Sequence, residues 1–134
     1  MRVLLDTNVF VAALLRSASC RSILESLRDG AFTLITSDPL INELVSVLGR
    51  AKFADSISSD DIRELLELIR REGRFVTPKS SPVAIRDPND RLVLNCLYAA
   101  DWLVTGDHDL QVLLRVGPST ILSPQAFLSR LAKR

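Results

Sequence analysis

Residues 3–9 read V-L-L-D-T-N-V, and this stretch decides the fold class. The three apolar residues at its start are typical of a buried strand in a parallel sheet, which is covered on both faces. Asp6 ends the strand, and a helical pattern from Val9 to Leu15 follows at once. A strand that passes directly into a helix predicts an α/β unit.

The same alternation of strands and helices continues along the chain. Strands are predicted at 32–36, 75–77, 102–105 and 120–122, and further helices at 23–27, 39–48, 62–72, 87–100, 110–116 and 124–131. The apolar stripe of the helix at 62–72 is assigned to core packing. No internal repeat or linker divides the chain. The expected fold class is therefore α/β, as one domain over residues 1–134 with a central parallel sheet flanked by helices on both faces.

Composition narrows the functional classes. The chain has 134 residues, is 47% hydrophobic and 25% charged, and carries a net charge of +1, so it is neither disordered nor strongly basic. Cys20 and Cys96 are expected to be reduced core thiols. With His108 the single histidine, a Cys/His zinc site lacks ligands. No stretch resembles a signal peptide or a membrane span, so a cytoplasmic protein is expected.

Four acids from separate parts of the sequence are predicted to meet at one edge of the sheet. Asp6 follows the first strand, and Asp107 comes two residues after the strand that ends at Thr105. Glu43 and Asp90 lie near the starts of helices, and these starts belong to the same edge. Clustered carboxylates repel one another unless a cation lies between them, and Mg²⁺ prefers oxygen ligands. The pattern indicates a metal site that could serve phosphodiester hydrolysis.

Each acid also has a purely structural interpretation. Asp6, followed by Thr-Asn, is a good helix N-cap, and Asp90 fits a capping box with the aspartate three residues before it. Glu43 borders an apolar stripe and could be a solvated side chain. Asp107 and Asp109 could be turn residues.

The motifs taken in order resemble the PIN-domain family, and within it the VapC-like toxin components of toxin–antitoxin pairs. The matching stretches are V-L-L-D-T-N-V at 3–9, T-S-D-P-L-I-N-E-L at 36–44, R-D-P-N-D-R at 86–91 and W-L-V-T-G-D-H-D-L at 102–110, with a weaker match, I-L-S-P-Q-A-F-L, at 121–128. The resemblance implies a small Rossmann-like sheet and an endoribonuclease that depends on Mg²⁺ or Mn²⁺. It also implies an RNA substrate, a homodimer and a protein antitoxin.

By position, Asp6, Glu43 and Asp90 match the first three acids of the family, as catalytic and metal-binding residues. The fourth falls on Asp107, with Asp109 as the second choice. Polar residues that match supporting positions are Thr7, Asn8 and Thr105, with Asp109 beside them. The implied products carry a 5′-phosphate and a 3′-hydroxyl. Three arginines, Arg86, Arg91 and Arg115, are candidate phosphate clamps, although a solvated surface charge is the favoured interpretation of each.

Other functions remain open at this level. A haloacid-dehalogenase-like phosphatase would need an acid at the position of Asn8, and a phosphoacceptor receiver module would need a second acid beside Asp6 and a lysine after a late strand. A PIN-like protein could also process RNA or act as a regulatory binding partner without a toxin role. The target RNA and the number of metal ions are not indicated by the sequence.

Overall fold

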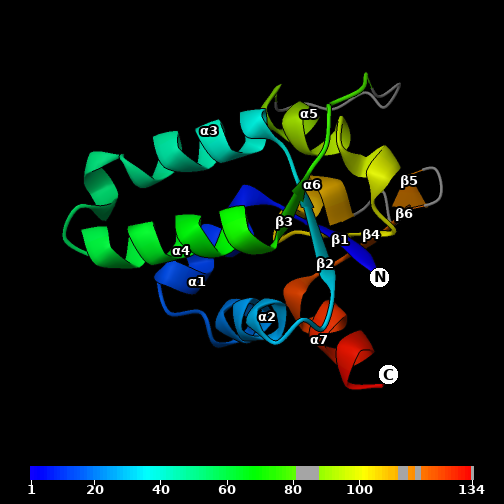
Figure 1. Ribbon diagram of the computed structural model, residues 1–134, viewed down its shortest axis with the longest axis horizontal. Coiled ribbons are helices and arrows are strands. Elements are labelled where there is room, and N and C mark those ends of the chain that lie inside the picture. Colours follow the sequence, from blue (N-terminus) through cyan, green and yellow to red (C-terminus); the bar gives the residue numbers. More distant parts are fainter. Residues whose placement is uncertain (81–87, 112–114, 117–118, 134) are drawn as a thin grey trace.

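The computed structural model describes residues 1–80, 88–111, 115–116 and 119–133 (Figure 1). Strands and helices alternate along most of these ranges. In chain order the elements are β1 (Arg2–Leu5), α1 (Thr7–Leu14), α2 (Ala18–Arg28), β2 (Thr33–Thr36), α3 (Asp38–Leu48), the 3₁₀-helix η1 (Ala51–Phe53), α4 (Ser59–Glu72), β3 (Gly73–Phe75), α5 (Pro88–Leu94), the 3₁₀-helix η2 (Leu97–Ala99), β4 (Trp102–Val104), α6 (His108–Gln111), β5 (Arg115–Val116), β6 (Ser119–Leu122) and α7 (Pro124–Ala132).

The strands form a single sheet in the order β3-β2-β1-β4-β6-β5. All neighbouring pairs are parallel except β5 with β6, so five parallel strands carry one short antiparallel edge strand. β1 lies in the interior, where Leu4 is opposite Ile35 of β2 and Leu103 of β4. The predicted parallel sheet is confirmed.

Alternate residues of β1 belong to different layers of the core, as expected for a pleated strand. Val3 and Leu5 pack with apolar residues of α1, α2, α4 and α7, and Leu4 packs with those of α5, η2 and α6. Figure 1 shows α2 and α7 on one side of the sheet and α5 and α6 on the other. The predicted α/β domain with helices on both faces is therefore confirmed.

Serine side chains cap four of the helices. The hydroxyls of Ser17, Ser37, Ser58 and Ser123 accept hydrogen bonds from backbone N–H groups in the first turns of α2, α3, α4 and α7. α1 differs, because its N-cap is Asp6, whose carboxylate accepts from the N–H of Thr7. Both side-chain types satisfy N–H groups that lack partners inside a helix.

The predicted helix over 87–100 is too long. α5 ends at Leu94, and backbone bonds of the i→i+3 type then form η2. The buried hydroxyl of Ser119 approaches the carbonyl oxygens of Leu97 at 3.0 Å and Ala100 at 2.7 Å. The contact fixes both carbonyls against β6. Consecutive apolar residues in this stretch gave no sign of the break.

The predicted helix over 110–116 is also wrong. α6 ends at Gln111, and Arg115–Val116 forms β5, which pairs with Ser119–Leu122. Arg115 is paired with Thr120 and Val116 with Ser119, and this pairing holds the two residues in strand form instead of helix. The strand predicted at 75–77 occurs two residues earlier, because α4 passes into β3 at Gly73. Glycine permits this junction of helix and strand, because a Cβ at Gly73 would lie 2.5 Å from the carbonyl oxygen of Ile69.

The predictions for the two cysteines and for the apolar stripe of α4 are confirmed. Cys20 and Cys96 are both buried and free of disulfides. Leu65, Leu68 and Ile69 of α4 are buried in the core, as predicted for that apolar stripe. Within the described ranges, no helix has the length and apolar character needed to cross a membrane.

Candidate active site

Asp6 lies at the carboxyl end of β1, where the chain leaves the sheet. Its backbone N–H donates to the carbonyl of Val104 at 3.0 Å, which extends the pairing of β1 with β4 by one residue. One carboxylate oxygen, Oδ1, accepts from the N–H of Thr7 at 2.7 Å. The strand fixes the Asp6 backbone, and the first turn of α1 fixes its side chain. Only 7% of the residue is exposed.

The second oxygen of Asp6 is held by two more side chains. Oδ2 accepts from the hydroxyl of Thr105 at 2.7 Å and from the amide of Asn8 at 3.1 Å. Thr105 Oγ1 in turn accepts from the N–H of Asp107 at 3.0 Å, and Asn8 Oδ1 accepts from the N–H of Gly106 at 3.1 Å. The loop after β4 is thereby tied to Asp6. Three of the four predicted supporting residues, Thr7, Asn8 and Thr105, contact the first acid.

The four predicted acids line one cavity of about 430 Å³. Asp6 and Asp107 reach it from the carboxyl ends of β1 and β4, Glu43 from α3 and Asp90 from the first turn of α5. Asp90 is 7% exposed, and Glu43 is half-buried. Four positions as far apart in sequence as 6 and 107 therefore converge at the edge of the sheet where ligands of α/β proteins bind.

The cavity accumulates negative charge. Burial raises the pKa of Asp6 above its ordinary value, and the nearby carboxylate of Asp107 raises it further, whereas hydrogen bonds from Thr105, Thr7 and Asn8 act in the opposite direction. Burial is the largest of these effects. A buried acid with a raised pKa, held by several donors in a cavity, is typical of a functional site.

The donor chemistry fits a hard divalent cation, since carboxylate oxygens are the ligands that Mg²⁺ prefers. In the described part of the chain, however, no three acids lie close enough together to hold one ion between them. Mutual repulsion of carboxylates is sufficient to keep such side chains apart. The four positions suit a metal site, and a bound ion would have to draw the carboxylates together.

Some predicted residues give no information here. Asp109 starts α6 with His108, but its side chain is outside the described part, so the choice between Asp107 and Asp109 rests on the cavity lining alone, which includes Asp107. Arg86 and the side chain of Arg115 are likewise outside it. Arg91 is described, and it does not line the cavity.

One part of the cavity lining, the basic and apolar wall, contains residues that were not among the predicted site residues. It is built by Leu15 at the end of α1, Val47 of α3, and Arg50, Lys52 and Phe53 around η1. An aromatic residue next to basic ones, as in Arg-Ala-Lys-Phe at 50–53, is a composition found in nucleic-acid-binding sites and could have drawn attention to this wall.

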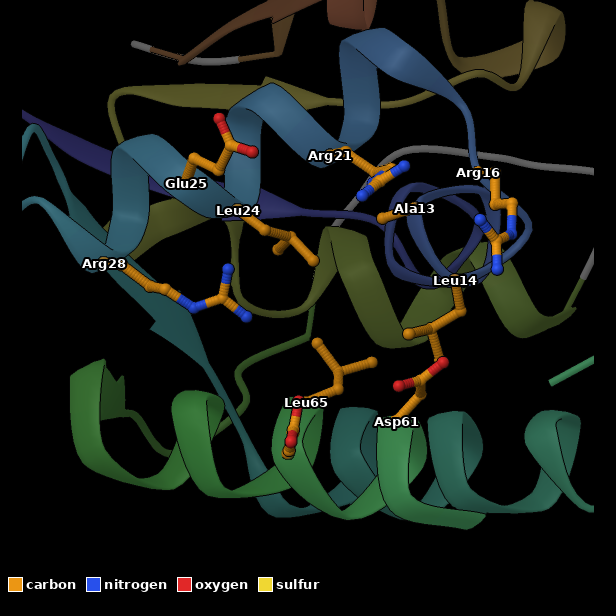
Figure 2. A pocket seen from close by; sticks show the side chains of 10 residues that line it. Ala13, Leu14, Arg16, Arg21, Leu24, Glu25, Arg28, Asp61 and Leu65 are labelled. Carbon is orange, nitrogen blue, oxygen red and sulfur yellow. The ribbon is translucent and has the colours of Figure 1, made fainter. Parts of the chain in front are cut away.

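A second cleft of about 320 Å³ lies between α2 and α4 and is lined by positively and negatively charged side chains. Figure 2 shows Leu24 and Leu65 facing each other across it, with Arg16 and Arg28 from one side and Asp61 from the other. These arginines form no ion pair with a described acid. The lining of this cleft holds three arginines and three acids, so the charges balance, whereas acids are in excess in the lining of the first cavity.

The sequence was compared with models of protein families. A model described as PIN domain matches residues 2–109, which is most of the chain. The chain belongs to the PIN domain family. A search of curated proteins and a search of solved structures each found no match. PIN domains are generally nucleases and typically use divalent metals, which agrees with an acid-lined cavity at this edge of the sheet.

Membership of the PIN domain family also bears on the alternative functions. A dehalogenase-like phosphatase needs a proton-donating acid two residues after the first aspartate. Asn8 occupies that place, and its amide donates to Asp6 while its carbonyl accepts from Gly106. Asn8 therefore positions Asp6 and has no acidic proton to give. The nuclease interpretation is favoured over the phosphatase and the receiver module.

Proposed function

We propose that this PIN domain is an endoribonuclease that depends on Mg²⁺ or Mn²⁺ and cleaves single-stranded RNA. The observation that carries the proposal is the convergence of Asp6, Glu43, Asp90 and Asp107 on one cavity. Here the described lining of the cavity contains no histidine or cysteine, in agreement with chemistry based on metal and water.

In this proposal Asp6, Asp90 and Asp107 hold the cation, and Glu43 binds it or orients a water molecule. When bound, the cation would neutralise charge on the phosphodiester and lower the pKa of a nearby water. The residues around Asp6 orient its carboxylate: Thr7, Asn8 and Thr105 leave it little freedom to rotate. Hydrolysis should leave a 5′-phosphate and a 3′-hydroxyl.

The test compares Asp6→Asn with the native protein on a labelled single-stranded RNA, with Mn²⁺, with Mg²⁺ and with EDTA. Asp6→Asn should lose cleavage by at least about a hundredfold, because a neutral amide neither holds the cation nor balances its charge. The matched control is Asp29→Asn at the exposed end of α2, which makes the same chemical change away from the cavity. Circular dichroism and urea unfolding verify that both variants fold.

Equal cleavage by native protein and Asp6→Asn would refute the proposed site. Cleavage that persists in EDTA would refute the metal dependence. Analysis of the product ends is a separate check, since a 2′,3′-cyclic phosphate would indicate attack by the RNA itself.

We further propose that the protein is the toxin of a toxin–antitoxin pair, a cytoplasmic homodimer inhibited by a protein antitoxin. This rests on the similarity of the ordered motifs to the VapC-like group. Expression in a bacterial host should stop growth, and Asp6→Asn should abolish that effect. Relief of the arrest by the product of the adjacent gene would identify the antitoxin. A nuclease that cleaves RNA without stopping growth would instead be an RNA-processing PIN protein.

A further inference from the structure

The basic and apolar wall of the cavity differs in chemical character from the four acids. Leu15, Val47 and Phe53 provide apolar surface, and Arg50 and Lys52 provide positive charge. Leu15 is 44% exposed, and both cations are exposed, so this wall is accessible from solvent. Apolar surface and cations in the same cavity complement a polynucleotide, because its bases have apolar faces and its phosphates are negatively charged.

The two cations are available to a ligand. Neither Arg50 nor Lys52 forms an ion pair with a described acid, although four carboxylates line the same cavity. The ammonium Nζ of Lys52 lies 5.0 Å from the centre of the Phe53 ring. Such a cation–π contact at an accessible site is weak. The four-carbon stem of the lysine lets the ammonium move to a phosphate, which would free one face of the ring.

Backbone hydrogen bonds hold this wall in place. The N–H of Arg50 donates to Val47 at 3.1 Å, and the N–H of Phe53 donates to Arg50 at 3.0 Å. The carbonyl of Phe53 accepts from Ser56 and from Ile57, both at 3.0 Å, and Ile57 is buried in the core. The ring of Phe53 is therefore carried by an ordered segment, which reduces the entropy cost of binding a partner.

We propose that Arg50, Lys52 and Phe53 form a nucleotide subsite, in which Phe53 stacks on an unpaired base and the two cations contact its flanking phosphates. This inference rests on the proposed function and adds to it how single strands are selected. A base within a duplex is stacked on both sides, so the Phe53 ring can only meet a base that has turned out of the stack. The three are positioning residues, and the acids act on the phosphodiester beside them.

Binding of a short 5′-labelled single-stranded RNA, measured by fluorescence anisotropy in EDTA, tests the subsite without cleavage. Phe53→Ala should weaken binding about tenfold, since stacking of one base on an aromatic ring has about that effect. Phe53→Tyr should restore most of the affinity. Arg50→Ala and Lys52→Ala should each lower the slope of log affinity against log salt by about 0.7, the value for one phosphate contact on a single strand.

The chain offers a matched control for each kind of change. Lys79 lies 4.4 Å over the ring of Tyr98 and does not line the cavity, so Lys79→Ala removes the same kind of cation–π pair elsewhere. Arg21→Ala removes one guanidinium from the second cleft. Both controls should leave the affinity and the salt slope unchanged.

A spectroscopic readout separates stacking from a merely structural effect. Trp102 is the single tryptophan of the chain, so Phe53→Trp in a Trp102→Phe background places the only indole in the subsite. Single-stranded RNA should quench its fluorescence, and the same sequence paired into a duplex should not.

The subsite would be overturned if the native protein did not bind RNA, or if Phe53→Ala bound it unchanged. It would also be overturned if the Lys79→Ala or Arg21→Ala control lost as much affinity, or if duplex RNA quenched the indole fluorescence of the Phe53→Trp variant as single strands do. The outcome is distinct from that of the proposed function. If the variants alter RNA binding but no metal supports cleavage, the nuclease proposal fails and the subsite stands. If the native protein cleaves RNA but the variants bind it normally, the subsite fails and the nuclease proposal stands.

Discussion

The hydroxyl of Thr105 connects Asp6 to the loop after β4, and replacing it by valine should expose the energetics of the site. Thr105→Val keeps the shape of a side chain that is fully buried, so it creates almost no cavity. It removes the 2.7 Å bond to the carboxylate of Asp6 and the 3.0 Å bond from the N–H of Asp107. A bond to a charged group contributes roughly 1.5–3 kcal/mol, and a neutral one about 1 kcal/mol. We expect a loss of about 2–4 kcal/mol in the free energy of unfolding at pH 7.

The pH dependence of this loss has a defined sign. The pKa of Asp6 is raised in the folded protein, so stability conferred by its neutral form is present at low pH and is lost as pH rises through the folded pKa. The Thr105 hydroxyl opposes that rise, and Thr105→Val therefore raises the pKa of Asp6 further. The difference between the native protein and Thr105→Val should be small near pH 4 and should widen toward pH 7.

Urea unfolding in EDTA at pH 4, 5.5 and 7 measures these free energies. Thr105→Ser, which keeps the hydroxyl, is the control and should cost about 1 kcal/mol at every pH, mostly for its lost methyl group. In an Asp6→Asn background the cost of Thr105→Val should fall by at least about 1 kcal/mol, because the charged partner is gone. A cost that is independent of pH, or unchanged by Asp6→Asn, would refute the argument that the hydroxyl stabilises a buried charge.

Three further predictions concern single side chains. Asp6→Ser keeps a helix cap but removes a buried acid whose pKa is raised, so the metal-free variant should be at least as stable as the native protein at pH 7 in urea unfolding. The gain in stability should appear as the pH rises from 4, and RNA cleavage should be lost. Phe127 is fully buried with its ring edge-to-face on Phe32 at 5.3 Å and Trp102 at 5.9 Å, so Phe127→Ala should lower the free energy of unfolding by roughly 3–5 kcal/mol, and Phe127→Leu by clearly less. Burial raises the pKa of the Cys96 thiol, so a thiol reagent should modify it in native protein far more slowly than in urea; equal rates would contradict its burial.

The sheet could be predicted because its strands carry their own signal. β1, β2, β4 and β6 are short apolar runs bounded by polar or turn residues, and each is buried by helices on both faces. The errors fall where tertiary contacts decide. The end of α5 depends on the Ser119 hydroxyl, which comes from a distant strand, and β5 has two residues whose strand form depends on pairing with β6.

The acids could be predicted for the same reason, because strand ends and helix starts of a parallel sheet share one edge. Asp6 and Asp107 needed only the strand boundaries. The basic and apolar wall could not be placed from the sequence pattern, since Arg50, Lys52 and Phe53 reach the cavity through the packing of α3 beside α1 and the turn after it. No periodicity in residues 51–58 reports that packing. The acids could thus be placed from the boundaries of strands and helices, whereas the basic and apolar residues could be placed only with the tertiary structure.

The choice of residue at position 6 separates the capping interpretation from the catalytic one. Ser17, Ser37, Ser58 and Ser123 show that this chain caps its other long helices with a neutral hydroxyl. Asp6 caps α1 through Oδ1, so capping is real, but that role uses one oxygen and requires no charge. Burial of the carboxylate costs free energy, as its raised pKa indicates, and two further side chains are committed to holding Oδ2. Helix capping alone explains neither the buried charge nor the two side chains that hold Oδ2. A carboxylate kept in a buried position beside other acids agrees with the proposed cation site rather than with capping alone.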